Sequence, residues 1–463
     1  MKDTQEMIRA SYQRKDLTSD DFKRRQVQRN QVLPHQLMRS SLLVSAEGFR
    51  AQVVFPAHCL LDLQALNRDG EQWRALTPEQ KTAYQKQLKT ETLPALPGLL
   101  GIPLLVDLEH LDGDWLFIES GDPEWLLRFN LAEYQQILAL SETPQTACSV
   151  PLVRARPNFN EPHNDEHEIR CAVEHITQKR VRARLSESIE IAPLPLSLQQ
   201  LLRLNSRDDV SSRELAGVIE MDPSLASQVI SWANSPYYGA PGRVQSIEDA
   251  VLRVLGFDLT MNLALGLGMS RHLALPKDGV HGHRSFWRDA LMHALLVERL
   301  VRTLPASLRP HQGTAYLAGL LYNFGYLVLA EVFPPHFSLY CRNQEANPHA
   351  PPMYVERFLF GITREQIASY LFTTWGLPQP LCVAIRQQFN PHYSGPHHVY
   401  ANLLYLATAY RHPQQAEQLK RVPEAVFSRL GISREAGLEA WQALNEQSQD
   451  RIEDLIRLLE TGR

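Results

Sequence analysis

The chain has 463 residues, of which 44% are hydrophobic and 21% are charged, and its formal net charge is −4 at pH 7. That length predicts two or three domains, and the small net charge excludes attraction of nucleic acid or an anionic membrane through bulk charge. The five cysteines are scattered and form no CxxC pair, which is typical of a reducing compartment.

The N-terminal region predicts a cytoplasmic protein. The stretch MKDTQEMIRASYQRKD has no apolar core of a secretory signal, and no apolar run approaches the length of a membrane span, so we expect no membrane partner. We assign residues 1–36 to a polar arm that contains a basic cluster of Lys23, Arg24, Arg25 and Arg29. Such a cluster is more often a solvated helix face, and the alternative is a contact with an RNA backbone.

Residues 37–142 predict a mixed α/β domain. Runs rich in Val, Ile, Leu and Phe indicate strands, and longer polar–apolar patterns indicate helices. The predicted strands lie at 41–46, 49–57, 102–108 and 114–120, and the predicted helices at 61–67, 76–88 and 132–140. Four prolines without periodicity at 143–164 predict a linker. With the helix that begins at Asp165, it forms a connecting region over 143–188.

Everything after this region predicts helices. We place one helical domain at 189–395 and a helical tail at 396–463. The pairs Ser211 with Glu214 and Thr363 with Gln366 have capping-box spacing and predict helix starts. The tail is interpreted as a cap that packs on the body, with a dimerisation helix as the alternative.

The segment MDPSLASQVISWANSPYYG, residues 221–239, is the most distinctive of the chain, and SIEDAVLRVLG follows it at 246–256. Asp222 suits an N-cap and Pro223 the first helical position. Asn234 is expected to end that helix, since its side chain can satisfy backbone groups there. The pattern predicts a helix, an ordered turn and a second helix.

This segment resembles the signature of HDOD domains, the HD-related output domains of bacterial signalling proteins. The pattern is a DP-x-L helix, an ANS-x-YYG turn, an SI-x-x-A helix and a final LG. The residues that carry the resemblance are Asp222, Pro223, Asn234, Ser235, Tyr237, Tyr238, Gly239 and Gly256. The resemblance implies an all-α regulatory domain with protein partners. For Asn234 and Ser235 a structural role is favoured, and recognition of a ligand or partner is the alternative.

HDOD domains are similar to HD phosphohydrolases, whose metal sites need a histidine, a His-Asp pair and further His and Asp ligands. The corresponding positions here hold Asp289, Tyr322, Asn323 and Arg364, followed by Gln388. Tyr and Asn are poor ligands for a hard cation and Arg would repel it, so we expect no metal and no cofactor. His281 and His283 are interpreted as loop residues, with a metal site as the alternative. His293 is interpreted as a satisfied interior histidine.

The strings VVFPAHCLLDLQALN at 53–67 and GIPLLVD at 101–107 resemble the YbaK/prolyl-tRNA-synthetase-associated domain, which removes misattached amino acids from tRNA. The resemblance implies a lysine in a K-[ST]-L strand and a Gly-x-x-Pro loop. In MRSSLLV, however, Ser40 stands at the lysine position, with Arg39 before it and Ser41 after it. Gly101 and Pro103 belong to the shortened loop. These five residues are the candidate, degenerate editing site, and His58-Cys59 is interpreted as structural.

The sequence therefore predicts a multidomain protein with an N-terminal α/β YbaK-like domain and an all-α HDOD domain. The favoured function is that of a non-catalytic signalling protein. It would have protein partners. The N-terminal resemblance also implies tRNA or an amino-acid-like ligand at that domain. The alternative is an active aminoacyl-tRNA deacylase with a regulatory HDOD module. A metal-dependent phosphohydrolase is the third interpretation.

Overall fold

The chain folds into two compact units in the computed structural model. The structure describes residues 25–66, 72–88, 90–97, 100–141, 143–181, 195–205, 207, 209–236, 238–239, 242–270, 283–412, 415–447 and 453. The α/β unit comprises Met1–Pro157 together with Ser338–Leu359. The helical unit comprises Asn158–Phe337 and Phe360–Arg463. Residues 338–359, which we predicted to belong to the helical domain, thus fold with the N-terminal part.

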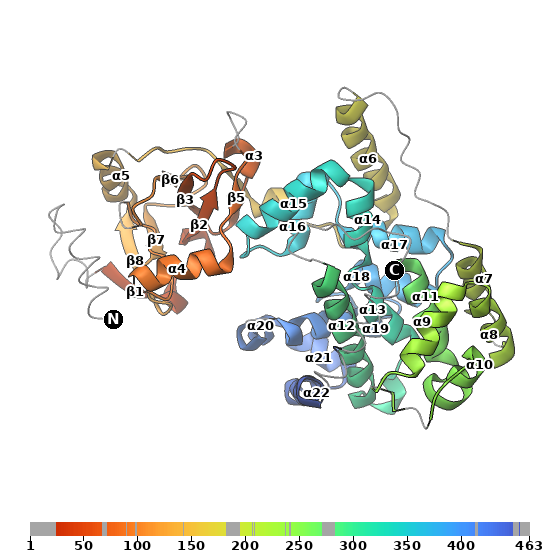
Figure 1. The fold of residues 1–463 in the computed structure, drawn as a ribbon. Coiled ribbons are helices and arrows are strands. Elements are labelled where there is room, and N and C mark those ends of the chain that lie inside the picture. The colour runs from red at the N-terminus through yellow and green to blue at the C-terminus, as the bar shows by residue number, and fades with distance from the viewer. Residues whose placement is uncertain are drawn as a thin grey trace. The chain divides into compact units, whose positions relative to one another are not determined.

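The α/β unit is built on a four-stranded sheet of order β5-β2-β3-β6 (Figure 1). Its strands are β2 (Met38–Val44), β3 (Arg50–Pro56), β5 (Arg74–Ala75) and β6 (Leu104–Val106). Three antiparallel strands form a second sheet: β1 (Gln26–Gln28), β8 (Trp125–Asn130) and β7 (Trp115–Glu119). A small third sheet pairs β4 (Cys59–Leu61) with β9 (Ser149–Pro151). The helices are α3 (Leu63–Leu66), α4 (Pro78–Leu88) and α5 (Leu131–Leu140).

Both faces of the central sheet are buried, which explains the apolar runs of its strands. One face contributes Met38 and Val54 to a core that includes Phe129 and Tyr134. The other contributes Val53 and Phe55 to a second core, which we call the Trp73 cluster: Leu43, Ala51, Val53, Phe55, Cys59, Leu61, Leu63, Trp73, Ala75, Cys148 and Ala346. The four predicted strands and three predicted helices are confirmed.

Short elements in this unit were not predicted. Strand β1 lies inside the segment that we assigned to a polar arm, and β9 lies inside the predicted linker, where it pairs with β4. Strand β8 was also missed, although Asn130 forms the expected cap of α5 as a full capping box with Glu133. Strands of three residues are too short for a period of two to stand out in sequence.

A helical hairpin from late in the chain completes the α/β unit. It consists of α15 (Pro334–Ala346) and α16 (Pro352–Phe360), of which residues 338–359 belong to this unit. The Asn347 amide pairs with both backbone groups of Leu61, accepting from its N–H at 2.6 Å and donating to its carbonyl at 2.9 Å. The His349 ring nitrogen Nε2 lies 2.9 Å from the carbonyl oxygen of Cys59. Because Ala346 is buried in the Trp73 cluster, the hairpin is part of that core.

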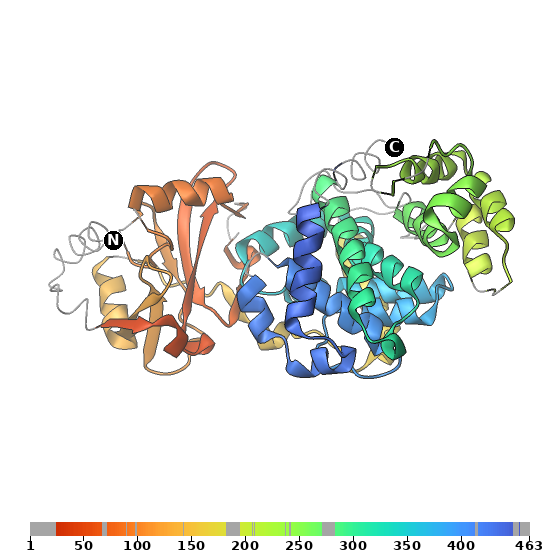
Figure 2. The ribbon, with the colours of Figure 1, turned by 90° about the horizontal axis from the view of Figure 1, so that it is seen from below.

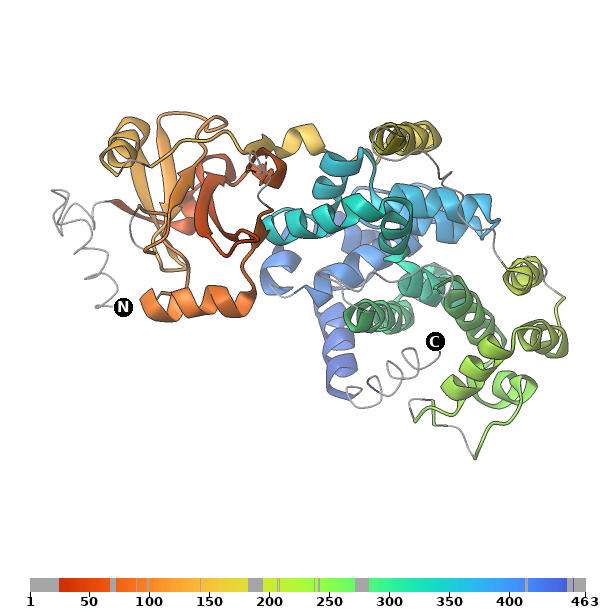
Figure 3. The ribbon, with the colours of Figure 1, turned by 45° about the horizontal axis from the view of Figure 1, so that its top comes forward.

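The helical unit begins with α6 (Asp165–Val181) and continues as a succession of short helices. They are α7 (Leu196–Asn205), α8 (Ser212–Glu220), α9 (Pro223–Ala233), α10 (Ile247–Ala250), α11 (Phe257–Ser270), α12 (His283–Thr303), α13 (Gln312–Leu321), α14 (Phe324–Val332), α17 (Arg364–Thr374), α18 (Gln379–Gln387), α19 (His398–Arg411), α20 (Gln415–Arg421), α21 (Glu424–Leu430) and α22 (Arg434–Gln447). Within the unit, α22 packs along α12 (Figure 2), and α7 to α10 form one group (Figure 3).

The predicted helix starts of this unit are confirmed. Ser211 and Thr363 form complete capping boxes, and Ser246 caps α10 by accepting from the Asp249 N–H. Beyond residue 395, where we place the start of the helical tail, α19 packs against α12 and α18. The last apolar repeat of the tail, residues 452–459, lies almost entirely outside the described residues.

One described stretch, Gln312–Val332, has the length and apolar composition of a membrane span. It covers α13 and α14, and 83% of its most apolar window is buried inside the structure. That burial is typical of a core helix, because an interior helix is apolar on all sides.

Candidate functional site

The four positions that correspond to metal ligands of HD phosphohydrolases lie in one cluster of the helical unit. The Arg364 guanidinium donates to Asn323 Oδ1 at 2.6 Å, and Arg411 donates to Asp289 Oδ1 at 2.6 Å. Arg411 also hydrogen-bonds the Tyr322 side chain. The four positions, which were chosen from sequence motifs alone, thus lie close together in the fold.

Arg411, at the end of α19, was not among the predicted site residues. It lies beyond the predicted domain boundary, and a single arginine in a helical tail carries no signal of its own. Its side chain is 14% exposed, and it donates to His293 Nδ1 at 3.3 Å as well as to Asp289. Two guanidinium groups, those of Arg364 and Arg411, thus occupy this cluster, which we call the HD-position cluster.

The HD-position cluster does not fit a divalent metal. A guanidinium repels a cation at close range, and it already neutralises the carboxylate that would bind one. Among the described residues there is no group of three or more His, Cys, Asp or Glu side chains that could hold a metal ion. His281 lies outside the described residues, as does the side chain of His283.

The cluster also offers no acid–base pair that titrates near neutral pH. His293 is fully buried, and burial together with the Arg411 charge holds its pKa well below 6.5. Its ring stacks on Tyr322 with centroids 4.0 Å apart, and burial raises the pKa of that phenol. Gln388 Nε2 donates to the carbonyls of Tyr322 and Ile385. We therefore assign the cluster a packing role.

Helices α17 and α18, where the HD resemblance places the later metal ligands, instead bind the start of α6. Arg386 forms a buried ion pair with Asp165, and its Nη2 also donates to the Asn158 carbonyl at 2.6 Å. Gln366 Nε2 donates to Asp165 Oδ1 and to Glu168 Oε2, both at 2.8 Å. These side chains attach the first turn of α6 to α17 and α18. The sequence showed only an acidic helix start at Asp165, so this attachment was missed.

The signature segment holds its turn through Asn234. The Asn234 amide donates to the Val244 carbonyl at 2.8 Å and accepts from the Val244 N–H at 2.8 Å. It also donates to the Ile230 carbonyl at 2.9 Å, at the end of α9. Asp222 Oδ1 accepts from the N–H groups of Ser224 and Leu225. Asn234 thus ties the end of α9 to the loop that leads into α10.

The other signature residues surround this turn. Ser235 is buried, and the Tyr238 ring packs on Trp232 with centroids 6.5 Å apart. Gly239 and Gly256 have φ angles of 60° and 78°, which favour glycine. Gly256 follows a π-helical turn, η5 (Val251–Leu255), that continues α10. Tyr237 lies outside the described residues.

The candidate editing residues of the α/β unit do not converge on one site. Ser40 Oγ accepts from Gln52 Nε2 at 2.7 Å, and Gln52 also donates to the Pro94 carbonyl at 2.9 Å. The Gln52 N–H donates to the Pro103 carbonyl. Because strand neighbours alternate between faces, Arg39 and Ser41 face away from Ser40. Gly101, with a φ of 65°, lies in the loop before β6.

Cys59 is buried in the Trp73 cluster, which supports a structural role for it. Two arginines of the basic cluster are paired within the unit, which weighs against the RNA contact. Burial raises the pKa of the Cys59 thiol to about 12, which removes its nucleophilic form. Arg25 pairs with Glu133 at 2.9 Å and lies over the Phe129 ring, and Arg29 pairs with Glu119. These two cations of the basic cluster are bound within the unit, and Lys23 and Arg24 lie outside the described residues.

Comparison with known proteins identifies the helical part. The HDOD domain family matches residues 191–391. A crystal structure of a candidate signal transduction protein from Marinobacter aquaeolei VT8 is 35% identical, covers 94% of this chain and 96% of that one, and superposes with a TM-score of 0.83. The chain belongs to the HDOD family. A protein of Treponema pallidum (strain Nichols), described as uncharacterized, is 25% identical over 215 residues, and the match spans 40% of its length.

The HDOD match changes how the hairpin of α15 and α16 is understood. Residues 338–359 lie inside the matched range, yet they fold with the α/β unit. For the N-terminal part, a structure described as a candidate trans-editing enzyme for prolyl tRNA synthetase matches 32% of this chain at 16% identity, with a TM-score of 0.25. The mixed α/β fold before an all-α HDOD domain is as predicted, and the editing role remains a prediction.

Proposed function

We propose that this HDOD protein is a non-catalytic, cytoplasmic regulatory protein of bacterial signalling that acts by binding protein partners. The observation that carries the proposal is the pairing of Arg411 with Asp289 and of Arg364 with Asn323. The two guanidinium groups of the HD-position cluster form a hydrogen-bonded scaffold in place of a metal centre. A scaffold of this kind presents surfaces and does not need to turn over a substrate.

The hairpin supplies a route by which the α/β unit can influence the HDOD domain. Residues 338–359 belong to the HDOD match and are held by Asn347, His349 and Ala346 within the α/β core. A change in that core alters the anchoring of α15, which continues directly into the helical unit. We propose that the α/β unit senses a ligand and that the HDOD domain transmits the result.

The test of the non-catalytic proposal is a metal and activity measurement on the full chain. The protein is loaded with Mn²⁺, Fe²⁺ or Zn²⁺, desalted and assayed for metal content and for hydrolysis of bis-(p-nitrophenyl) phosphate. We expect far less than one metal per chain and no chelator-sensitive hydrolysis. One tightly held metal per chain, with activity lost on chelation, would overturn the proposal.

The deacylase alternative is tested separately with several mischarged tRNAs and with the variant Ser40→Lys beside the native chain. Ser40 supplies no cation, and its hydroxyl is bound by Gln52. A lost charged contact costs about 1.5–3 kcal/mol, or roughly a tenfold to hundredfold loss in rate. Efficient turnover by the native chain would place the deacylase first. Capture of partners from bacterial lysate, followed by mass spectrometry, would then identify the signalling context.

A further inference from the structure

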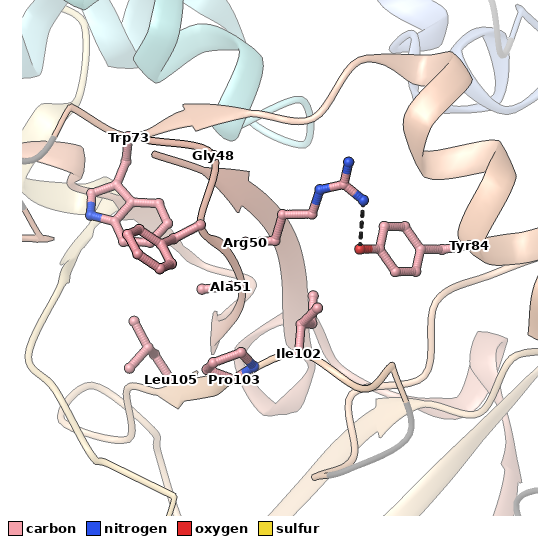
Figure 4. Close-up of a pocket in the computed structure, with 9 residues that line it drawn as sticks. Gly48, Arg50, Ala51, Trp73, Tyr84, Ile102, Pro103 and Leu105 are labelled. Carbon is pink, nitrogen blue, oxygen red and sulfur yellow. Dashed lines mark hydrogen bonds between the residues drawn. The ribbon is translucent and has the colours of Figure 1, made fainter. Parts of the chain in front are cut away.

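A cavity of about 600 Å³ lies in the α/β unit, at the end of the central sheet where β3 begins. Ala51 and Leu105 form its base, and Trp73 stands on one side of it (Figure 4). Arg50 and Tyr84 form the other side, with the Arg50 guanidinium directed toward the Tyr84 hydroxyl. Phe49 also lines the cavity, and it is 61% exposed, which is unusual for a large apolar side chain. The size is in the range of small-molecule sites.

This cavity is not the candidate editing site. Ala51 belongs to the Trp73 cluster, and Leu105 packs against the same cluster. Ser40 and Gln52 do not line the cavity, although Arg50 shares the Gln52 side of β3, because strand residues alternate between faces. Of the five candidate editing residues, only Pro103 also lines the cavity. The two locations can therefore be tested independently.

The lining selects for a ligand with an apolar body and one negative charge. Of the described residues that line the cavity, Arg50 is the one that carries a charge. Its Nη1 donates to the Tyr84 hydroxyl at 3.1 Å, and the guanidinium lies 5.9 Å from the centre of the Tyr84 ring. Tyr84 thus orients the guanidinium through one of its five N–H groups. The remaining donors match the two oxygens of a carboxylate, which a planar guanidinium binds in pairs.

We propose that this cavity binds a small aromatic monocarboxylate, with its ring against Trp73 and Leu105 and its carboxylate on Arg50. A single guanidinium balances one charge, which favours a carboxylate over a phosphate dianion. The proposal rests on the ligand-sensing role proposed above for the α/β unit. Because Ala346 is in the Trp73 cluster, an occupied cavity stabilises the core that anchors α15.

The experiment is isothermal titration of the full chain with 1-naphthylacetate, with its neutral amide and with acetate. We expect one molecule of 1-naphthylacetate per chain with a submillimolar Kd, about tenfold weaker binding of the amide, and no measurable binding of acetate. Equal affinities for the acid and the amide would contradict the role of Arg50. No binding of either naphthyl compound would overturn the site.

Three variants separate recognition from folding. Arg50→Gln removes the charge, and Phe49→Glu places a carboxylate at the exposed edge of the cavity, so both should weaken 1-naphthylacetate binding by about tenfold or more with the Tm unchanged. Arg128→Gln is the matched control, since Arg128 is an exposed arginine of β8 that lies over Trp115. Binding by Arg50→Gln as tight as that of Arg128→Gln would overturn the proposal.

The result is independent of the non-catalytic proposal. Titration measures binding to the α/β unit and needs neither a partner nor a metal measurement. If the chain binds 1-naphthylacetate through Arg50 but holds a catalytic metal, the function proposal fails and the site stands. If the chain is metal-free but Arg50 makes no difference to binding, the site fails and the function proposal stands.

Discussion

The positions at which the two resemblances imply catalytic residues are occupied differently in the two units. In the helical unit, the HD-position cluster is filled by Arg364 and Arg411, which bind Asn323 and Asp289 and lie next to a buried His293. In the α/β unit, the group that binds Ser40 is neutral, because it is the side-chain amide of Gln52. A charged group inside the helical unit needs a partner that balances its charge. The neutral hydrogen bond between Ser40 and Gln52 needs no such charge balance. The first arrangement is therefore the harder one to alter without unfolding.

The largest effect is expected at the buried attachment of α6. Arg386→Ala or Asp165→Ala leaves one charge without its partner, because both side chains are under 10% exposed. Breaking a buried pair of this kind costs about 3–5 kcal/mol in unfolding free energy. Urea unfolding followed by circular dichroism measures it. Arg253→Ala is the control, since it breaks an exposed pair with Asp249 and should cost under about 1 kcal/mol. Equal effects of the two would contradict the role of the attachment.

Arg411 carries the next effect, and it is the direct test of the charge argument. Arg411→Ala removes the cation from Asp289 and from Tyr322, and we expect a loss of about 2–3 kcal/mol from charged hydrogen bonds. Arg411→Lys should not restore it, because an ammonium cannot reproduce the planar donor geometry. Arg302→Ala, at an exposed pair with Glu298, is the control. Full stability of Arg411→Lys would show that charge alone is sufficient.

Asn234→Ala should cost about 1–2 kcal/mol. It leaves the N–H and carbonyl of Val244 without the side chain that pairs with both, and the site is partly open to water. The Tm should fall, and partner capture should weaken only as far as unfolding explains. An unchanged Tm with abolished partner capture would instead make Asn234 a recognition residue.

The sequence could predict what depends on neighbours along the chain. The caps at Asp222, Ser211, Ser246 and Thr363 were all predictable, since each is set by residues within one helical turn. The central strands were predictable because their apolar runs are long. The position of Arg411, the Asp165–Arg386 pair and the docking of Asn347 on Leu61 join residues 118 or more positions apart. Such pairings depend on the tertiary fold, and a single sequence holds no local pattern for them.

One histidine in each unit makes stability depend on pH: His293 is buried in the helical unit, and His349 is partly buried in the α/β unit. The folded pKa of His293 is well below 6.5, and that of His349 is lowered to about 4, mainly by burial. Below pH 6.5 the unfolded chain therefore binds more protons than the folded one, and stability falls as the pH falls. Each histidine contributes a slope of up to about 1.4 kcal/mol per pH unit. Urea unfolding between pH 8 and pH 5 measures this slope.

Matched variants assign the slope to each unit. His293→Gln and His349→Gln should each flatten the pH dependence by about one proton. His349→Gln should act on the α/β unit, because His349 contacts Cys59 and Phe55 there. A slope that neither variant changes would mean that carboxylates, and not these histidines, set the acid sensitivity.

The smallest effect on stability is expected at Ser40, and this position also gives the strictest test of the comparison between the two units. Ser40→Ala removes one neutral hydrogen bond from Gln52, which keeps its bond to the Pro94 carbonyl, so the cost is about 0.5–1.5 kcal/mol. Gln52→Leu should cost more, because it leaves both the Ser40 hydroxyl and the Pro94 carbonyl without their donor in a buried place.

If Ser40 is only a structural partner of Gln52, both variants should hydrolyse mischarged tRNA at the same rate as the native chain. A loss of measurable deacylation in Ser40→Ala alone, at an unchanged Tm, would show that the serine retains a catalytic task and that the α/β unit has kept what the helical unit lost.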